Sequence, residues 1–134
     1  MSIPYRLTPL KDNISSHPKT GYYAQIVTRG TIDTAELCEE ISAGCTLTTA
    51  DMKAAIEALI SSVSKKLKAG YNVCIDDLGT FSLSAESETV SSPDEIHSQS
   101  VRVKNIHFRP SVRMKKSMKN SEFERVVTKK NSEQ

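Results

Sequence analysis

One stretch of this chain, LKAGYNVCIDDLGTFSL from Leu67 to Leu83, limits the possible folds more than any other. An amphipathic helix ends at Gly70, and residues 71–75 predict a short strand directly after it. Residues 76–81, DDLGTF, predict a tight turn, because Asp and Gly favour turn conformations. A return strand follows this turn. The stretch therefore predicts a helix joined directly to a β-hairpin, in a fold that mixes helices and strands.

Two helices are predicted before the hairpin. The first begins at Asp33, where Asp33 and Glu36 have the spacing of a capping box, and Gly44 ends it. The second begins at Thr48, and its apolar residues recur at the three- and four-residue spacings of one helix face. These residues are Met52, Ile56, Leu59, Ile60, Val63 and Leu67.

The chain begins with two predicted strands. Residues 3–8 alternate apolar and polar side chains, and Pro4 favours an edge position or the strand start. Residues 22–29, YYAQIVTR, are rich in aromatic and β-branched side chains and predict the second strand. Between them, residues 9–21 predict a loop. We therefore expect an N-terminal strand pair ahead of the helices.

After the hairpin, the sequence first becomes polar and then alternates apolar and basic residues. Residues 84–100 are polar and have no strong period, and apolar and basic residues then alternate from Val101 to Lys104. Asn105 marks an expected bulge in this last strand. A short helix follows, with Met114 and Met118 one turn apart. The last apolar side chains expected to pack are Phe123 and Val126.

Charge is distributed unevenly, although the whole chain carries a net charge of only +2. Residues 1–100 hold 8 Lys and Arg against 13 Asp and Glu, a net charge of −5. Residues 101–134 hold 10 against 3, a net charge of +7. So dense a basic segment favours contact with a polyanion, and the alternative is a solvated tail.

Catalytic and metal chemistry are poorly supported by the sequence. The three cysteines lack paired spacing and suggest free thiols in a reducing compartment. Asp76 and Asp77 suit a turn better than an acid–base or metal pair. The sequence shows neither a nucleophile elbow nor a phosphate-binding loop. We therefore expect a protein that is not an enzyme, with no catalytic residues, metal, cofactor or small-molecule substrate.

From Asp33 on, the predicted order is helix, helix, strand, Gly-Thr-Phe turn, strand, arm, strand and short helix. This order, with DLGTF at residues 77–81 and Phe-Arg-Pro at residues 108–110, resembles the HU/IHF family of bacterial histone-like DNA-binding proteins. The added N-terminal strands resemble the HU-related subgroup of Bacteroides-type bacteria. The resemblance implies an α+β, HU/IHF-like fold with two helices, a three-stranded sheet with an arm, and a short C-terminal helix. It also implies a homodimer, whose partner chain would cover the apolar face that one chain leaves bare.

The predicted arm departs from this family. The family's arm carries several Arg and Lys residues and an Arg-Asn-Pro tip whose proline wedges between base pairs. Here residues 84–100 contain four carboxylates and lack Lys and Arg, and phosphates would repel such an arm. Pro93 lies in a Ser-Pro-Asp sequence, so we expect it to be an ordinary loop proline.

The predicted DNA contacts therefore lie outside the arm, on the last strand and the basic helix. The predicted DNA-binding residues are Arg102, Lys104, Arg109, Arg113, Lys115, Lys116 and Lys119. Such cations neutralise phosphates without reading the base sequence. The leading hypothesis is a dimeric nucleoid-associated protein that binds and condenses double-stranded DNA. The alternative is an HU-fold module for protein–protein contact or scaffolding, with weak or no DNA binding.

Three segments are expected along the chain. They are an N-terminal β extension at residues 1–30, an HU-like domain at 31–126 with its arm at about 84–100, and a disordered tail at 127–134. The first ten residues lack the pattern of a signal peptide, and the apolar runs are too short to span a membrane. The expected location is therefore the cytoplasm, in the nucleoid.

Overall fold

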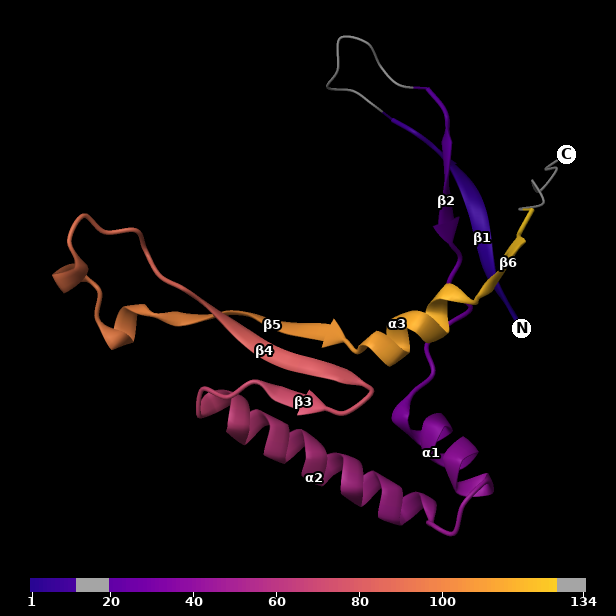
Figure 1. Ribbon diagram of the computed structural model, residues 1–134, viewed down its shortest axis with the longest axis horizontal. Helices are drawn as coiled ribbons and strands as arrows, with labels where there is room; N and C mark the ends of the chain where they lie inside the picture. Colours follow the sequence, from indigo (N-terminus) through magenta and orange to yellow (C-terminus); the bar gives the residue numbers. More distant parts are fainter. Residues whose placement is uncertain (12–19, 128–134) are drawn as a thin grey trace, which may run out of the picture. The chain divides into compact units, whose positions relative to one another are not determined.

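The computed structural model describes residues 1–11 and 20–127, so most of the expected tail lies outside the described residues. The chain divides into two compact units. One is formed by residues 33–119, and the other by the residues up to Ile32 together with those from Asn120 on. Each unit has a three-stranded sheet of its own (Figure 1).

The two predicted helices form the first part of the unit at residues 33–119. Helix α1 spans Thr34–Ala43, and helix α2 spans Thr49–Lys68. Both begin at the predicted caps: the Asp33 carboxylate accepts the Glu36 N–H at 2.9 Å, and the Thr48 hydroxyl accepts the Asp51 N–H at 3.1 Å. Each cap satisfies a backbone N–H that has no partner inside the helix.

Helix α2 ends in a motif that directs the chain into the sheet. Gly70 has the left-handed φ of 92°, which costs glycine little because it has no Cβ. The Tyr71 N–H donates to the Lys66 carbonyl and the Gly70 N–H donates to the Leu67 carbonyl, both at 3.0 Å. This is a Schellman arrangement, and it confirms the helix end predicted at Gly70.

The sheet of this unit contains strands β3 (Val73–Ile75), β4 (Gly79–Glu86) and β5 (Arg102–Pro110), all antiparallel and in that order. Asp76 and Asp77 form the predicted turn between β3 and β4. The Leu78 N–H donates to the Ile75 carbonyl at 3.0 Å, and Asp77 has a left-handed φ of 64°. Asp tolerates that conformation better than most residues do.

Close packing between β4 and β5 explains the glycine of the Gly-Thr-Phe sequence. Phe81 lies opposite Phe108, and their ring centroids are 5.0 Å apart. Gly79 is buried beside them. A Cβ at Gly79 would lie 2.5 Å from the Arg109 carbonyl oxygen and 2.6 Å from two ring carbons of Phe108. The close approach of β5 therefore requires glycine at this position.

The strand register divides the sheet into an apolar and a polar face, because paired residues share a face and successive residues alternate. Phe81 pairs with Phe108 and Leu83 with Ile106, which makes one face apolar. Helix α2 lies along this face (Figure 1). The intervening residues of β4 and β5 are polar and point to the opposite face.

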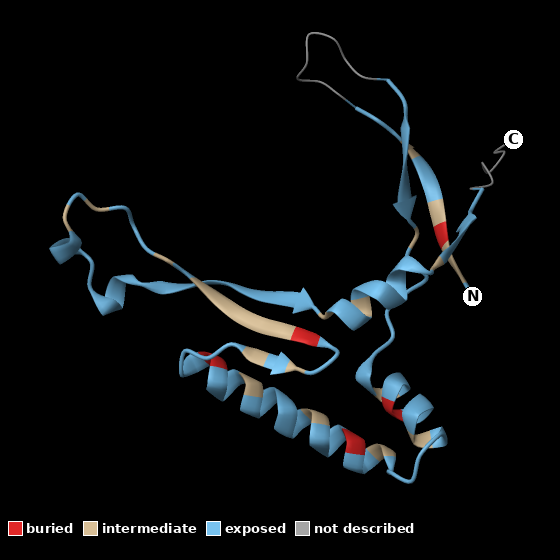
Figure 2. Cartoon of the chain, in the orientation of Figure 1, coloured by how far each residue is buried: buried red, intermediate tan, exposed pale blue. Residues whose placement is uncertain are grey.

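The interior of this unit is thin. Among residues 33–119, the buried apolar side chains are Cys38, Met52 and Leu67 (Figure 2). Ile41, on α1, and Ile60, on α2, remain more than half exposed although they belong to apolar helix faces. A single chain therefore leaves much of the apolar surface of this unit accessible to solvent.

The predicted arm extends from β4 and β5. The ladder continues to the pair of Glu86 and Arg102, and it shifts register between Ser84 and Ala85. Lys104 is the extra residue at this bulge, one position before the predicted site at Asn105. Beyond the ladder, two short 3₁₀ turns cover Pro93–Glu95 and Ser98–Ser100.

The second unit contains the predicted N-terminal strand pair and one strand that we did not predict. Strand β1 (Ser2–Pro9) pairs antiparallel with β2 (Tyr22–Ile26), which is shorter than the predicted 22–29. Strand β6 (Glu122–Arg125) pairs with β1 in parallel. Its Phe123 makes an edge contact with the Tyr5 ring at 6.4 Å. Residues 122–125 thus pair with the N-terminal strand, although the sequence analysis assigned them to the HU-like segment.

The edge position considered for β1 was wrong, because this strand is central in the order β2-β1-β6. Pro4 is compatible with a central strand here because the ladder with β2 begins only at Tyr5, opposite Ile26. Pro4 stands opposite Val27, one position before that start, so its missing N–H removes only the reciprocal bond to Val27 at the end of the ladder. The Pro4 carbonyl still accepts the Val27 N–H at 2.9 Å.

Candidate nucleic-acid interface

Helix α3, which spans Val112–Lys119, carries the densest group of predicted DNA-binding residues. Ser111 precedes it, and the Ser111 hydroxyl accepts the Met114 N–H at 3.1 Å, as an N-cap does. The spacing of three and four residues places Lys115, Lys116 and Lys119 on one face of this helix. All three lysines are exposed, whereas Met114, on the opposite face, is half-buried.

The polar face of the β4–β5 pair carries a second group of candidate residues. Thr80 pairs with Arg109, Ser82 with His107, and Ser84 with Asn105, so these six side chains share the face opposite the aromatic pair. His107 Nε2 lies 3.0 Å from the Ser84 hydroxyl. Hydroxyl, amide and guanidinium groups are the side chains that commonly contact DNA phosphates.

Sequence reasoning named Arg109 as a candidate DNA-binding residue but did not place it on this sheet face, and it missed the hydroxyl residues of β4 that share the face. The signal was available in the alternation of β4, TFSLS, where every second residue from Thr80 is a hydroxyl residue. That alternation becomes informative only when the partner strand and its register are known.

Two of the seven predicted cations are paired with carboxylates. Arg102 Nε lies 2.8 Å from Glu86 Oε1 at the base of the arm, and Arg113 Nη1 lies 3.3 Å from Asp77 Oδ2. Arg102, Arg113 and Asp77 are well exposed, and Glu86 is partly exposed. Exposed pairs contribute about 0–1 kcal/mol each, so a phosphate could replace either carboxylate at small cost.

The other five predicted residues lie at three different places in the structure. Lys104 occupies the bulge of β5, and Arg109 lies on the polar sheet face described above. Among the described residues, the ion pairs with carboxylates involve Arg102 and Arg113 and leave the three α3 lysines unneutralised.

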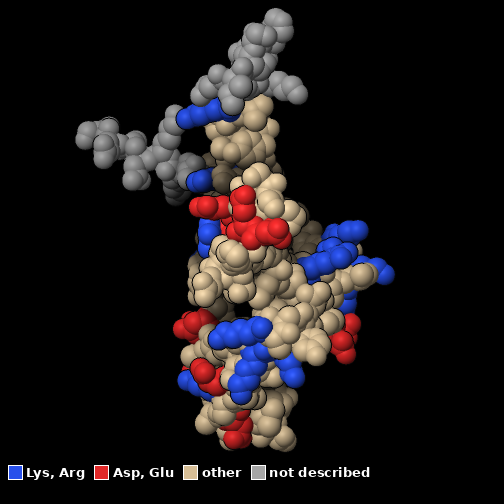
Figure 3. Space-filling model, turned by 90° about the vertical axis from the view of Figure 1, so that its left-hand side faces the viewer, with Lys and Arg blue, Asp and Glu red and all other residues tan. Residues whose placement is uncertain are grey.

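The arm contrasts with these basic elements. Glu88, Asp94 and Glu95 lie beyond the last strand pair, and the Ser91 hydroxyl donates to Glu95 Oε1 at 3.4 Å. Figure 3 looks at the molecule from the side of the arm tip and shows acidic side chains gathered there. The arm therefore presents negative potential, which phosphates repel.

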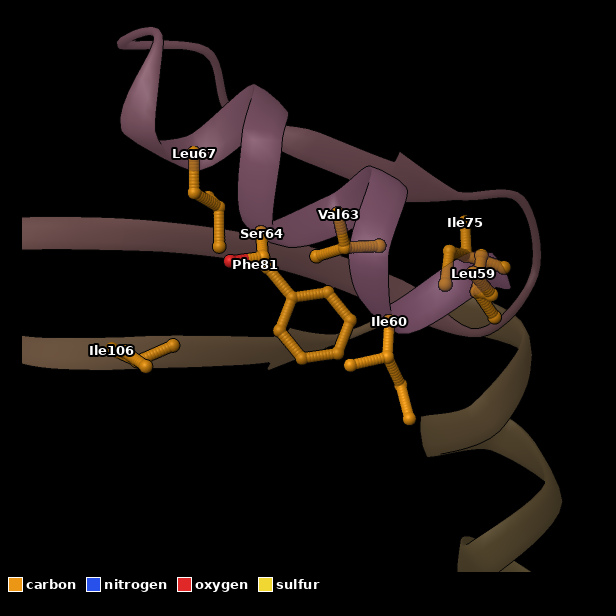
Figure 4. A pocket seen from close by; sticks show the side chains of 8 residues that line it. All are labelled: Leu59, Ile60, Val63, Ser64, Leu67, Ile75, Phe81 and Ile106. Carbon is orange, nitrogen blue, oxygen red and sulfur yellow. The ribbon is translucent and has the colours of Figure 1, made fainter. Parts of the chain in front are cut away.

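An open apolar groove of about 310 Å³ lies between α2 and the apolar sheet face (Figure 4). Ile60 and Val63 from α2 point towards Phe81 and Ile106 of the sheet (Figure 4). The groove is lined by Leu59, Ile60, Val63, Ser64, Leu67, Ile75, Phe81 and Ile106. A lining with so few polar groups suits another apolar surface better than a nucleic acid.

Within residues 1–11 and 20–127, no group of three His, Cys, Asp or Glu side chains is placed to hold a metal ion. None of the helices in these ranges is long and apolar enough to cross a membrane.

The sequence matches a family of known proteins. A family model named HU-HIG, an HU domain fused to a wHTH, Ig or glycine-rich motif, matches residues 1–125. A comparison with curated proteins finds none that matches this sequence.

A solved structure shares the fold. It is the crystal structure of a protein from Bacteroides vulgatus ATCC 8482 described as a candidate bacterial DNA-binding protein. The TM-score is 0.69 at 14% sequence identity, over 93% of this chain and 48% of that one. This chain therefore spans about half the length of that protein. The likeness confirms the predicted α+β, HU-like fold with added N-terminal strands, and because the family model covers nearly the whole chain, the chain belongs to the HU-HIG family.

Proposed function

We propose that this protein is a homodimer that binds double-stranded DNA in the nucleoid, largely independently of base sequence. Its membership of an HU-domain family supports DNA binding in general terms. The fold that it shares with a protein described as a candidate DNA-binding protein is consistent with the same activity. The contacts would come from β5 and α3 and would neutralise phosphates.

The observation that carries this proposal is the lysine face of α3. Lys115, Lys116 and Lys119 project from one side of a helix whose N-terminus is capped by Ser111. A row of exposed cations on a fixed helix can follow a phosphate backbone, whereas the same charges on a flexible tail would lose more conformational entropy on binding. Arg109 and the hydroxyl residues of the polar sheet face would add further phosphate contacts.

The homodimer is supported by the apolar groove. Phe108 and Ile106 remain exposed on the apolar sheet face, and Ile60 is exposed on the helix that lies along it. Large exposed apolar patches on a soluble protein mark interaction sites, and a two-fold dimer would cover the same patch on both chains. We therefore assign the groove to a second copy of this chain.

One observation favours a different function. The acidic arm extends beyond the last strand pair of the HU-like unit, and its charge opposes contact with DNA. An HU fold used for protein contact could present such an arm to a basic partner, with little affinity for DNA. This second function predicts that DNA binding is weak even at low salt.

A titration of the protein into a labelled duplex separates the two functions. Fluorescence anisotropy would be measured at about 50 mM and about 200 mM salt, with two duplexes of unrelated sequence. The proposed function predicts binding at the lower salt, a steep loss at the higher salt, and similar affinity for both duplexes. The absence of binding at the lower salt contradicts it.

A further inference from the structure

Helix α3 is held mainly at its first turn. Seven of its eight residues are exposed, and Met114 is half-buried. A helix of this length is not stable by itself in water. The direction in which its lysines point must therefore depend on how its N-terminus is attached to the sheet.

The attachment is made by Ser111 and the β3–β4 turn. The Ser111 N–H donates to the Leu78 carbonyl at 3.0 Å, and the Ser111 hydroxyl donates to the Asp77 carbonyl at 2.7 Å. The same hydroxyl accepts the Met114 N–H at 3.1 Å. One serine therefore starts the helix and binds it to a turn more than thirty residues earlier in the chain.

Asp77 contributes to this attachment through its backbone and through its side chain. Its left-handed conformation, with φ 64°, sets the direction of the carbonyl that accepts the Ser111 hydroxyl. Its carboxylate lies 3.3 Å from Arg113, in the first turn of α3. The ion pair is exposed and weak, so the backbone hydrogen bonds are the stronger part of the attachment.

We propose that Asp77 and Ser111 are positioning residues, which hold α3 so that Lys115, Lys116 and Lys119 align with a phosphate backbone. Neither residue needs to touch DNA. The inference rests on the proposed function, because it explains how the same surface is oriented. It assigns a role in binding to an acidic residue, where charge alone would predict that Asp77 opposes binding.

The first test is whether substitutions of Asp77 raise or lower the affinity for DNA. Asp77→Asn removes the negative charge and keeps a residue that tolerates the left-handed conformation, so we expect unchanged or up to about threefold tighter DNA binding. Asp77→Val also removes the charge but disfavours that conformation. We expect it to bind about tenfold more weakly, with a smaller dependence of affinity on salt, because fewer lysines reach phosphates.

The second test substitutes Ser111, the residue that caps α3. Ser111→Ala should weaken binding by about tenfold and lower the slope of log affinity against log salt by about one or more. Ser111→Thr keeps the hydroxyl and should restore both values. A loss of global stability alone would reduce the active fraction without changing the slope, and urea unfolding of each variant would measure that fraction.

The outcomes separate this inference from the proposed function. If the wild-type protein binds DNA and Ser111→Ala keeps its affinity and salt slope, the positioning role is overturned and the proposed function stands. Tighter binding by Asp77→Val would also overturn it. If the wild-type protein does not bind DNA, the proposed function itself has failed.

Discussion

Substitution of Gly79 by alanine should destabilise the protein more than substitution of Gly70 or Gly44 by alanine. The new Cβ would lie 2.5 Å from the Arg109 carbonyl oxygen and 2.6 Å from the Phe108 ring. The carbonyl belongs to a strand that is paired at this position, and the ring packs against Phe81, so neither can move without loss. Overpacking of this kind typically costs 1–3 kcal/mol, and the backbone clash places our expectation at about 3 kcal/mol.

Two other glycines provide graded controls for this value. At Gly70 a Cβ would meet open space, so alanine there should cost only the left-handed backbone conformation, about 1–2 kcal/mol. At Gly44 a Cβ would lie 3.7 Å from the Ile41 carbonyl, an ordinary contact, and the free energy of unfolding should change by less than about 0.5 kcal/mol.

Urea unfolding followed by circular dichroism would measure all three variants. The protein concentration must be held constant, because the stability of the proposed dimer would depend on it. The expected order of destabilisation is Gly79, then Gly70, then Gly44. A Gly79→Ala protein as stable as the Gly44→Ala protein would refute the steric account of the Gly-Thr-Phe sequence.

Three further predictions follow from other parts of the structure. Ile60→Asp places a charge in the apolar groove and should convert the proposed dimer into a monomer, as measured by light scattering during size-exclusion chromatography. Glu57→Gln, on the same helix, should leave the dimer intact. A dimeric Ile60→Asp protein would show that the groove is not the interface. Asp33→Ala removes the α1 cap and should lower the free energy of unfolding by about 1 kcal/mol, and an unchanged urea midpoint would contradict the role of the 2.9 Å contact with Glu36. Glu86→Gln breaks the exposed ion pair with Arg102 and should change stability by less than about 1 kcal/mol; a larger loss in the same urea assay would mean that the pair fixes the arm.

Local signals in the sequence were sufficient for most of the fold. The Asp33 and Thr48 caps, the apolar period of α2 and the Gly70 end depend on residues a few positions apart, so they could be predicted directly. The turn at Asp76 and Asp77 was predicted for the same reason.

Features that depend on distant partners were harder to predict. Strand β6 has four residues and pairs with a strand about 120 positions away, and its EFER sequence has no strong strand period. The central place of β1 was missed with it, because β6 provides the second neighbour. The bulge at Lys104 was misplaced by one residue, because only the register with β4 shows which residue is unpaired.

The candidate site was predictable in composition but not in geometry. The charge asymmetry identified Arg102 and Arg113 as candidate DNA-contacting cations. The carboxylate partners of these two arginines are 16 and 36 residues away, and the sequence alone does not indicate such pairs. The role proposed for Ser111 likewise depends on a contact with Asp77 across 34 positions.

The most direct test of the central claim compares the salt dependence of DNA binding in two triple variants. Lys115, Lys116 and Lys119 become alanine in the first, and Lys53, Lys65 and Lys66 on α2 become alanine in the second, so both lose the same charge. If the α3 lysines neutralise phosphates, the slope of log affinity against log salt should fall by up to about 2.7 per bound chain in the first variant. The second variant should keep a slope close to that of the wild type. Equal slopes in the two variants would contradict the assignment of α3 as the DNA-binding element.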